Sequence, residues 1–112
     1  DIALDPFPFN GHTTVCDALW MGVPSIMLEG DRYASRFGGS TLRALGLDEL
    51  IGRSVDEYVE IAVQLAQDRS RLADLRSTLR ERMLASPLMD ASGFARRVES
   101  AYREMWRAWC AS

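Results

Sequence analysis

Two short apolar segments with one helical segment between them constrain the fold of this chain more than any other feature. Residues 2–4 form the first apolar run, and residues 25–28 form the second. The helical segment between them ends at Gly22, and Pro6 and Pro8 impose an extended connection before it. Because a strand–helix–strand crossover is right-handed, the two strands are expected to lie parallel in one sheet. The sequence therefore predicts an α/β fold.

The loop that enters this helix carries the residues that indicate a ligand. Its sequence places Gly11, His12, Thr13 and Thr14 at the predicted start of the helix, with Asp17 about one turn further on. The first N–H groups of a helix have no partner within it and lie at the positive end of its dipole, so a phosphate bound there gains both hydrogen bonds and a favourable field. Gly11 allows close backbone approach, and the two threonine hydroxyls and the imidazole can donate to phosphate oxygens. Asp17 shares the face of the threonines and accepts only, which suits the paired hydroxyls of a ribose.

Each of these residues also has an ordinary structural explanation. Thr13 and Thr14 are common N-cap residues, and Asp17 favours the helix dipole wherever it lies near a helix start. A single histidine such as His12 is more often solvated or hydrogen-bonded in a core than bound to a ligand. The ordered set after a strand favours a nucleoside diphosphate site at the carboxyl end of that strand.

The rest of the chain is predicted to be mainly helical. We expect a helix over residues 33–45, a very short strand within 47–51, and three further helices. Ser54 and Glu57 are predicted to form a capping box, Asp68 to cap the next helix, and the last helix to begin near Asp90. The apolar positions that recur at helical spacing are Val55, Tyr58, Val59, Ala62, Leu65 and Ala66, then Leu72, Leu75, Leu79 and Met83, and finally Phe94, Val98, Ala101, Tyr102, Met105 and Trp109.

Several spaced blocks together resemble one known family. They are residues 1–5, 10–14, 17–24, 30–36 and 85–88. In this order they are similar to the carboxy-terminal end of the O-linked N-acetylglucosamine transferases and their bacterial relatives, and the likeness spans essentially the whole chain. The resemblance implies a GT-B glycosyltransferase in which two Rossmann-like halves clamp a UDP-sugar, with this chain as the last part of the second half.

The same resemblance implies roles for the motif residues. Gly11, His12, Thr13 and Thr14 would lie at the UDP diphosphate, and Asp17 at the uridine ribose. Family members place N-acetylglucosamine or a related sugar on serine or threonine hydroxyls of proteins, with inversion and without a metal, so no cofactor is expected. The family's diphosphate-binding lysine, uracil contacts and tetratricopeptide repeats would lie upstream, and this chain contains no lysine. We therefore expect residues 1–112 to be a partial UDP-sugar-binding domain, strand–helix–strand over 1–30 and mainly helical over 31–112, and inactive alone.

Composition excludes some partners and leaves others open. A net charge of −3 argues against nucleic acid and against a basic membrane-binding surface, and no apolar run is long enough for a membrane span. Cys16 and Cys110 have no metal-ligand spacing and are predicted to be buried free thiols, consistent with a cytoplasmic protein. The edge of the first strand is expected to be open, so that the isolated chain would self-associate.

Three further positions lie near the predicted site, and two other functions fit parts of the sequence. Gly30 and Asp31 could line the site, whereas Arg36 is expected to tie its helix to a neighbouring loop rather than face the cleft. The alternative to a transferase half-site is a noncatalytic interaction module that docks a partner through its aromatic last helix. A nucleotide-sugar epimerase is less favoured because its acid and base carboxylates are not identifiable.

Overall fold

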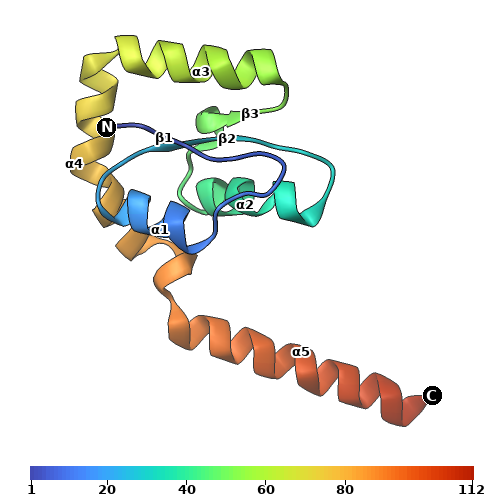
Figure 1. Cartoon of the computed structure of the whole chain (residues 1–112). Coiled ribbons are helices and arrows are strands. Elements are labelled where there is room, and N and C mark those ends of the chain that lie inside the picture. The colour runs from blue at the N-terminus through green and yellow to red at the C-terminus, as the bar shows by residue number, and fades with distance from the viewer.

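A three-stranded parallel sheet lies at the centre of the computed structural model, which describes residues 1–112. The strands are β1 (Ala3–Leu4), β2 (Ser25–Leu28) and β3 (Ile51–Gly52), in the order β1-β2-β3. Helix α3 covers one face of this sheet, and α1 and α2 lie on the other side (Figure 1). The arrangement confirms the predicted fold class, a short parallel sheet followed by helices.

Five α-helices and three short 3-10 turns complete the chain. The helices are α1 (Thr13–Trp20), α2 (Phe37–Ala44), α3 (Val55–Gln67), α4 (Arg69–Ala85) and α5 (Ala91–Ala111), and the 3-10 turns are η1 (Tyr33–Ser35), η2 (Asp48–Leu50) and η3 (Pro87–Met89). Asp68 and Asp90 accept the N–H groups of Arg71 and Gly93, which confirms the predicted cap at Asp68 and the predicted start of the last helix near Asp90. The capped ends explain why α4 and α5 begin where they do.

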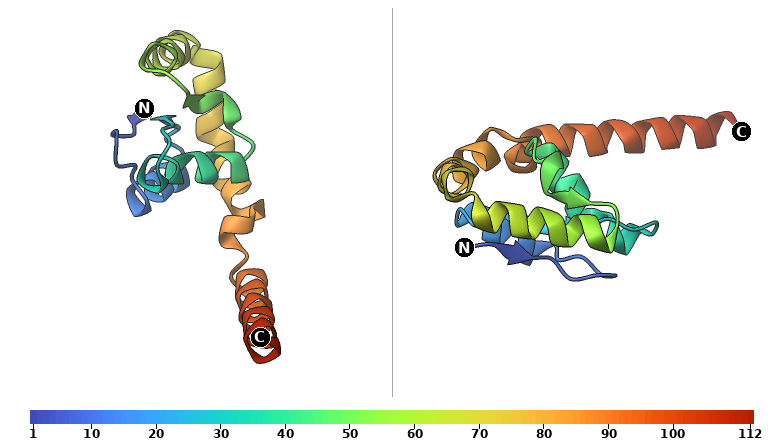
Figure 2. Two further views of the ribbon diagram at one scale, coloured as in Figure 1. Left: turned by 90° about the vertical axis from the view of Figure 1, so that its right-hand side faces the viewer. Right: turned by 90° about the horizontal axis from the view of Figure 1, so that it is seen from above.

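The core is one cluster of thirteen buried apolar side chains between the sheet and the helices. Helix α4 contributes Leu75, Leu79 and Met83, and Leu72 packs against the cluster from its edge. These four positions confirm the predicted apolar stripe of this helix. In the view from above in Figure 2, α4 is seen nearly end-on at one end of the body, where it contacts both α1 and α3.

Two predicted elements are shorter than expected. The helix predicted over residues 33–45 is broken, because Ser35 folds its hydroxyl back onto the carbonyl of Arg32 (3.0 Å) and closes a 3-10 turn before α2 begins. The strand predicted within 47–51 is confined to Ile51 and Gly52, since residues 48–50 form another 3-10 turn. Short polar side chains compete with regular backbone pairing in just this way.

The prediction of which apolar residues of α3 are buried is partly wrong. Tyr58, Ala62 and Leu65 face the core as expected, but Val55 and Val59 are exposed, as is Ala66. Ile61 packs against the core instead, so the buried line is narrower than the apolar pattern suggests.

The capping box at the start of α3 also differs. The Glu57 N–H donates to Ser54 Oγ (3.1 Å) as predicted, whereas the Glu57 carboxylate accepts the N–H of Arg53 (2.7 Å) rather than that of Ser54. The carboxylate therefore satisfies a donor one residue earlier than the usual motif would.

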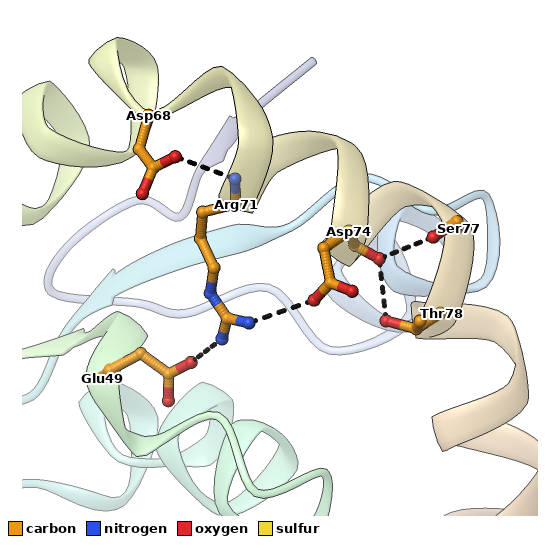
Figure 3. Close-up of polar contacts among 6 residues, drawn as sticks. All are labelled: Glu49, Asp68, Arg71, Asp74, Ser77 and Thr78. Carbon is orange, nitrogen blue, oxygen red and sulfur yellow. Dashed lines mark hydrogen bonds and ion pairs between the residues drawn. The ribbon is translucent and has the colours of Figure 1, made fainter.

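Arginine side chains cover the exposed faces of the helices, and some of them also connect neighbouring elements. Arg71 on α4 pairs with Glu49 of η2 and with Asp74 one turn along its own helix, as Figure 3 shows. Arg80 reaches back to the carbonyl of Trp20 (3.0 Å) and lies over its ring. Contacts between exposed groups contribute little individually to stability, so these links join neighbouring elements without adding much to the free energy of unfolding.

Helix α5 extends away from the rest of the molecule after the turn at η3 (Figure 1). Its predicted apolar face lies mostly in solvent, with Phe94, Tyr102, Met105 and Trp109 all exposed. Although α5 is the longest helix, with 21 residues, it is not apolar enough to cross a membrane, and neither is any other helix.

The isolated 112-residue chain is expected to self-associate through β1. This strand lies at the edge of the sheet, and Leu4 is 58% exposed. Unpaired strand edges with apolar side chains favour pairing with another chain. Size-exclusion chromatography with light scattering should show a dimer or larger species, and Leu4→Lys should shift it toward monomer. A monomer at high concentration for the unmodified chain would contradict this expectation.

Candidate nucleotide-binding site

The amino end of α1 is the only part of the predicted motif that presents free backbone donors. The first hydrogen bond of the helix runs from the Cys16 N–H to the His12 carbonyl (3.2 Å), and no side chain caps this end. The N–H groups of Thr13, Thr14 and Val15 therefore have no carbonyl partner within the helix. The alternative in which Thr13 or Thr14 is an N-cap is wrong, because the N-cap position is His12.

Three motif side chains share the open face of α1. Thr13, Thr14 and Asp17 are exposed, whereas Val15 and Leu19 on the opposite face are buried. The spacing of three and four residues puts both hydroxyls next to the carboxylate along one side of the helix. The geometry thus brings together free N–H groups, two hydroxyls and one carboxylate on an accessible helix start.

His12 lies between the starts of α1 and α2. Its imidazole stacks on Phe37, the first residue of α2, with ring centroids 3.4 Å apart, and Phe9 and Tyr33 lie further out at 6.0 and 6.4 Å. The His12 Nε2 atom is covered and makes no hydrogen bond. The ring is therefore held by aromatic contacts rather than by a hydrogen bond.

The amino end of α2 adds a second uncapped helix start beside His12. The first hydrogen bond of α2 runs from the Ser40 N–H to the Arg36 carbonyl (3.2 Å), and no side chain caps this end. Two free helix starts are not expected from the sequence, because the helix predicted over residues 33–45 runs through the start of α2. The stack of His12 on Phe37 places the starts of α1 and α2 next to each other.

Gly11 is confined by its neighbours. Its N–H donates to Asp5 Oδ1 (2.8 Å), and a Cβ atom at this position would collide with the Thr14 hydroxyl. Any larger residue would displace the start of α1. Since the N–H is already engaged, Gly11 serves the site by its small size rather than as a donor.

An open groove of about 660 Å³ adjoins this cluster. It is lined by Asp31, Tyr33, Arg36, Phe37, Ser40 and Arg43. Tyr33 and Phe37 also contact His12, so the groove and the motif are continuous. The sequence identified Asp31 as a possible lining residue but gave no signal for the two aromatic side chains.

The structural tie predicted for Arg36 is made by another arginine. Arg36 is exposed on the groove and forms no ion pair or side-chain hydrogen bond. Arg43, two turns further along α2, binds both carboxylate oxygens of Glu29 at 2.8 Å. These hydrogen bonds lower the pKa of Glu29 below its usual range, and they fix α2 to the end of β2. Gly30, which follows Glu29, packs against the Ser35 hydroxyl and does not line the groove.

The two cysteines are separate from the site chemistry. Both thiols are free, as predicted, but only Cys16 is partly buried, and Cys110 on α5 is exposed. Cys110 is exposed because α5 leaves the body of the molecule. Burial, and to a lesser degree the charge of Asp17, raises the pKa of the Cys16 thiol, which disfavours a reactive thiolate.

The family description glycosyl transferase family 41 matches residues 1–98. The chain belongs to this family. A probable UDP-N-acetylglucosamine–peptide N-acetylglucosaminyltransferase SPINDLY of Solanum lycopersicum is 50% identical over 98% of the chain, and the SEC protein of Arabidopsis thaliana, described by the same activity, is 40% identical over the same share. The K341M mutant of the Thermobaculum terrenum O-GlcNAc transferase matches 97% of the chain with a TM-score of 0.90 and 45% identity.

The family 41 relatives are much longer than this chain. It spans 12% of the tomato protein, 11% of the SEC protein and 21% of the solved Thermobaculum chain. The predicted family resemblance is confirmed, and the similarity to an O-GlcNAc transferase structure agrees with the GT-B fold class.

Proposed function

We propose that this chain forms the nucleotide-binding part of a UDP-N-acetylglucosamine-dependent protein glycosyltransferase. The full-length enzyme would transfer the sugar to serine or threonine hydroxyls of a protein acceptor, with inversion and without a metal ion. The proposed contacts are Gly11, His12, Thr13 and Thr14 at the diphosphate and Asp17 at the ribose. The similarity to family 41 transferases supports the chemistry, and the open start of α1 supports the assignment of residues.

The free amino end of α1 is the observation on which the proposal depends most. A leaving diphosphate carries negative charge that must be stabilised as the glycosidic bond breaks. The unpaired N–H groups of α1 and the positive end of its dipole are suited to this, and the adjacent start of α2 adds a second favourable dipole. A helix end of this kind can stabilise the leaving group in place of a cation, which is why we propose a metal-independent reaction.

The test is a transfer assay on the full-length protein with UDP-N-acetylglucosamine and a serine-containing acceptor. Product should form in the presence of a chelator, and NMR should show the opposite anomeric configuration from the donor. A panel of other nucleotide sugars should react more slowly. Loss of activity with chelator would contradict metal independence, and preference for another nucleotide sugar would contradict the proposed donor.

A noncatalytic docking module is the second candidate function. The exposed aromatic face of α5, including Trp106 and Trp109, is the observation that favours it. A module of this kind would have no use for nucleotide, so a full-length protein that neither binds UDP nor transfers sugar would support it over the transferase.

A further inference from the structure

Asp5 is a buried carboxylate directly beneath the motif loop. It follows β1, is only 5% exposed, and its backbone N–H donates to the Ile26 carbonyl of β2 (2.9 Å). From the other side the Tyr58 hydroxyl of α3 donates to the Asp5 carbonyl (3.2 Å). The sheet and α3 therefore hold this residue in one place.

One carboxylate oxygen holds the turn that enters α1. Oδ1 accepts the Gly11 N–H at 2.8 Å and lies 3.1 Å from the point where a Gly11 Cβ would be. The Thr14 hydroxyl crowds the same point. Asp5 and Thr14 therefore both pack against Gly11, so a shift of the carboxylate would disturb the turn on which the Thr14 hydroxyl rests.

The other carboxylate oxygen faces the start of α2. Oδ2 is buried without a hydrogen-bond partner and lies 3.0 Å from the point where a Cβ of Gly38 would be. Gly38 is the second residue of α2, and the Met27 sulfur lies 3.1 Å from the same point. A negative charge next to an uncapped helix start is favourable. Burial raises the pKa of Asp5, while the Gly11 N–H and the His12 charge act in the opposite direction.

We propose that Asp5 is the positioning residue of the diphosphate site, aligning the starts of α1 and α2 through its two carboxylate oxygens. It does not touch the phosphates itself, because it is covered by the loop that would contact them. An asparagine could still accept from Gly11, but its amide group would put a donor in place of an acceptor beside the uncapped start of α2. The inference rests on the proposed function, since it assigns Asp5 to the same site.

The test compares binding of UDP and of uridine to the full-length protein. Asp5→Asn should weaken UDP binding about tenfold, the order expected for losing one buried charged partner, and should leave uridine binding unchanged. Gly38→Ala is a second variant that crowds the carboxylate from α2 without removing it, and it should cause the same selective loss. Asp56→Asn makes the same change at an exposed position in the first turn of α3, and this control should bind both ligands like the wild type.

The outcomes separate positioning from general stabilisation. If Asp5→Asn lowers the affinities for UDP and uridine equally, or lowers neither, the inference is wrong. If Asp5→Asn does not fold, unchanged UDP affinity in Gly38→Ala overturns the inference, and a selective loss supports it. A wild-type protein that does not bind UDP would overturn the proposed function itself, and the inference with it.

Discussion

Replacing Asp17 by alanine in the full-length protein is expected to weaken UDP binding by about 1–3 kcal/mol, or roughly 5- to 150-fold in the dissociation constant. The carboxylate lies exposed on α1, one turn from the free N–H groups. Its proposed partners are the two ribose hydroxyls, which would lose their acceptor. Thr14→Val, which keeps the shape of the side chain but removes its hydroxyl, should lower affinity over the same range. Isothermal titration with UDP measures both.

A matched control for Asp17 is present on another helix. Asp56 is also an exposed aspartate near the start of a helix, and Asp56→Ala should bind UDP like the wild type. Unchanged affinity in both Asp17→Ala and Thr14→Val would remove these residues from the site. The same loss in Asp56→Ala would show that the effect is one of overall charge.

Leu75→Ala should destabilise the isolated chain by about 2–5 kcal/mol, the usual cost of a cavity at a fully buried leucine. Leu75 is 0% exposed and lies in the core that α4 shares with the sheet and the neighbouring helices. Small domains are marginally stable, so this loss removes a large part of the free energy of unfolding. Urea denaturation followed by circular dichroism should show a lower midpoint with little change in slope.

Leu84→Ala on the same helix is the control for this substitution. Leu84 is 56% exposed, so its truncation leaves no cavity and should change the free energy of unfolding by less than about 0.5 kcal/mol. If the two variants were equally stable, Leu75 would not lie in the core as described.

The sequence predicted the elements that are defined by local signals. The apolar runs of β1 and β2, the cap at Asp68, the start of the last helix near Asp90 and the stripe of α4 were all identified from residues close together in the sequence. The break before α2 was missed because it depends on Ser35 folding back onto Arg32, which a helical apolar pattern does not reveal. The exposure of Val55 and Val59 was missed because an apolar stripe in the sequence does not show how much of it other elements cover in the fold.

The candidate site was predicted only where its residues lie close together in the sequence. The motif on α1 is continuous in sequence, so Thr13, Thr14 and Asp17 could be placed together on one face. Phe37, which stacks on His12, and Asp5, which holds Gly11, come from elements that only the fold brings to the motif. Asp5 carries one usable signal in the sequence, an ionisable residue directly after a strand, but this signal does not show that its side chain lies under Gly11.

The projection of α5 affects how the molecule unfolds. Only Gly93 is buried along the 21 residues of this helix, so its amides depend on their own helical hydrogen bonds and on the cap at Asp90. Most of the stability of a helix in a protein comes from packing of its apolar face, and α5 has almost none of this packing. The isolated chain therefore has two regions with different cooperativity: a layered body that unfolds as a unit, and a carboxy-terminal arm that frays at far lower cost.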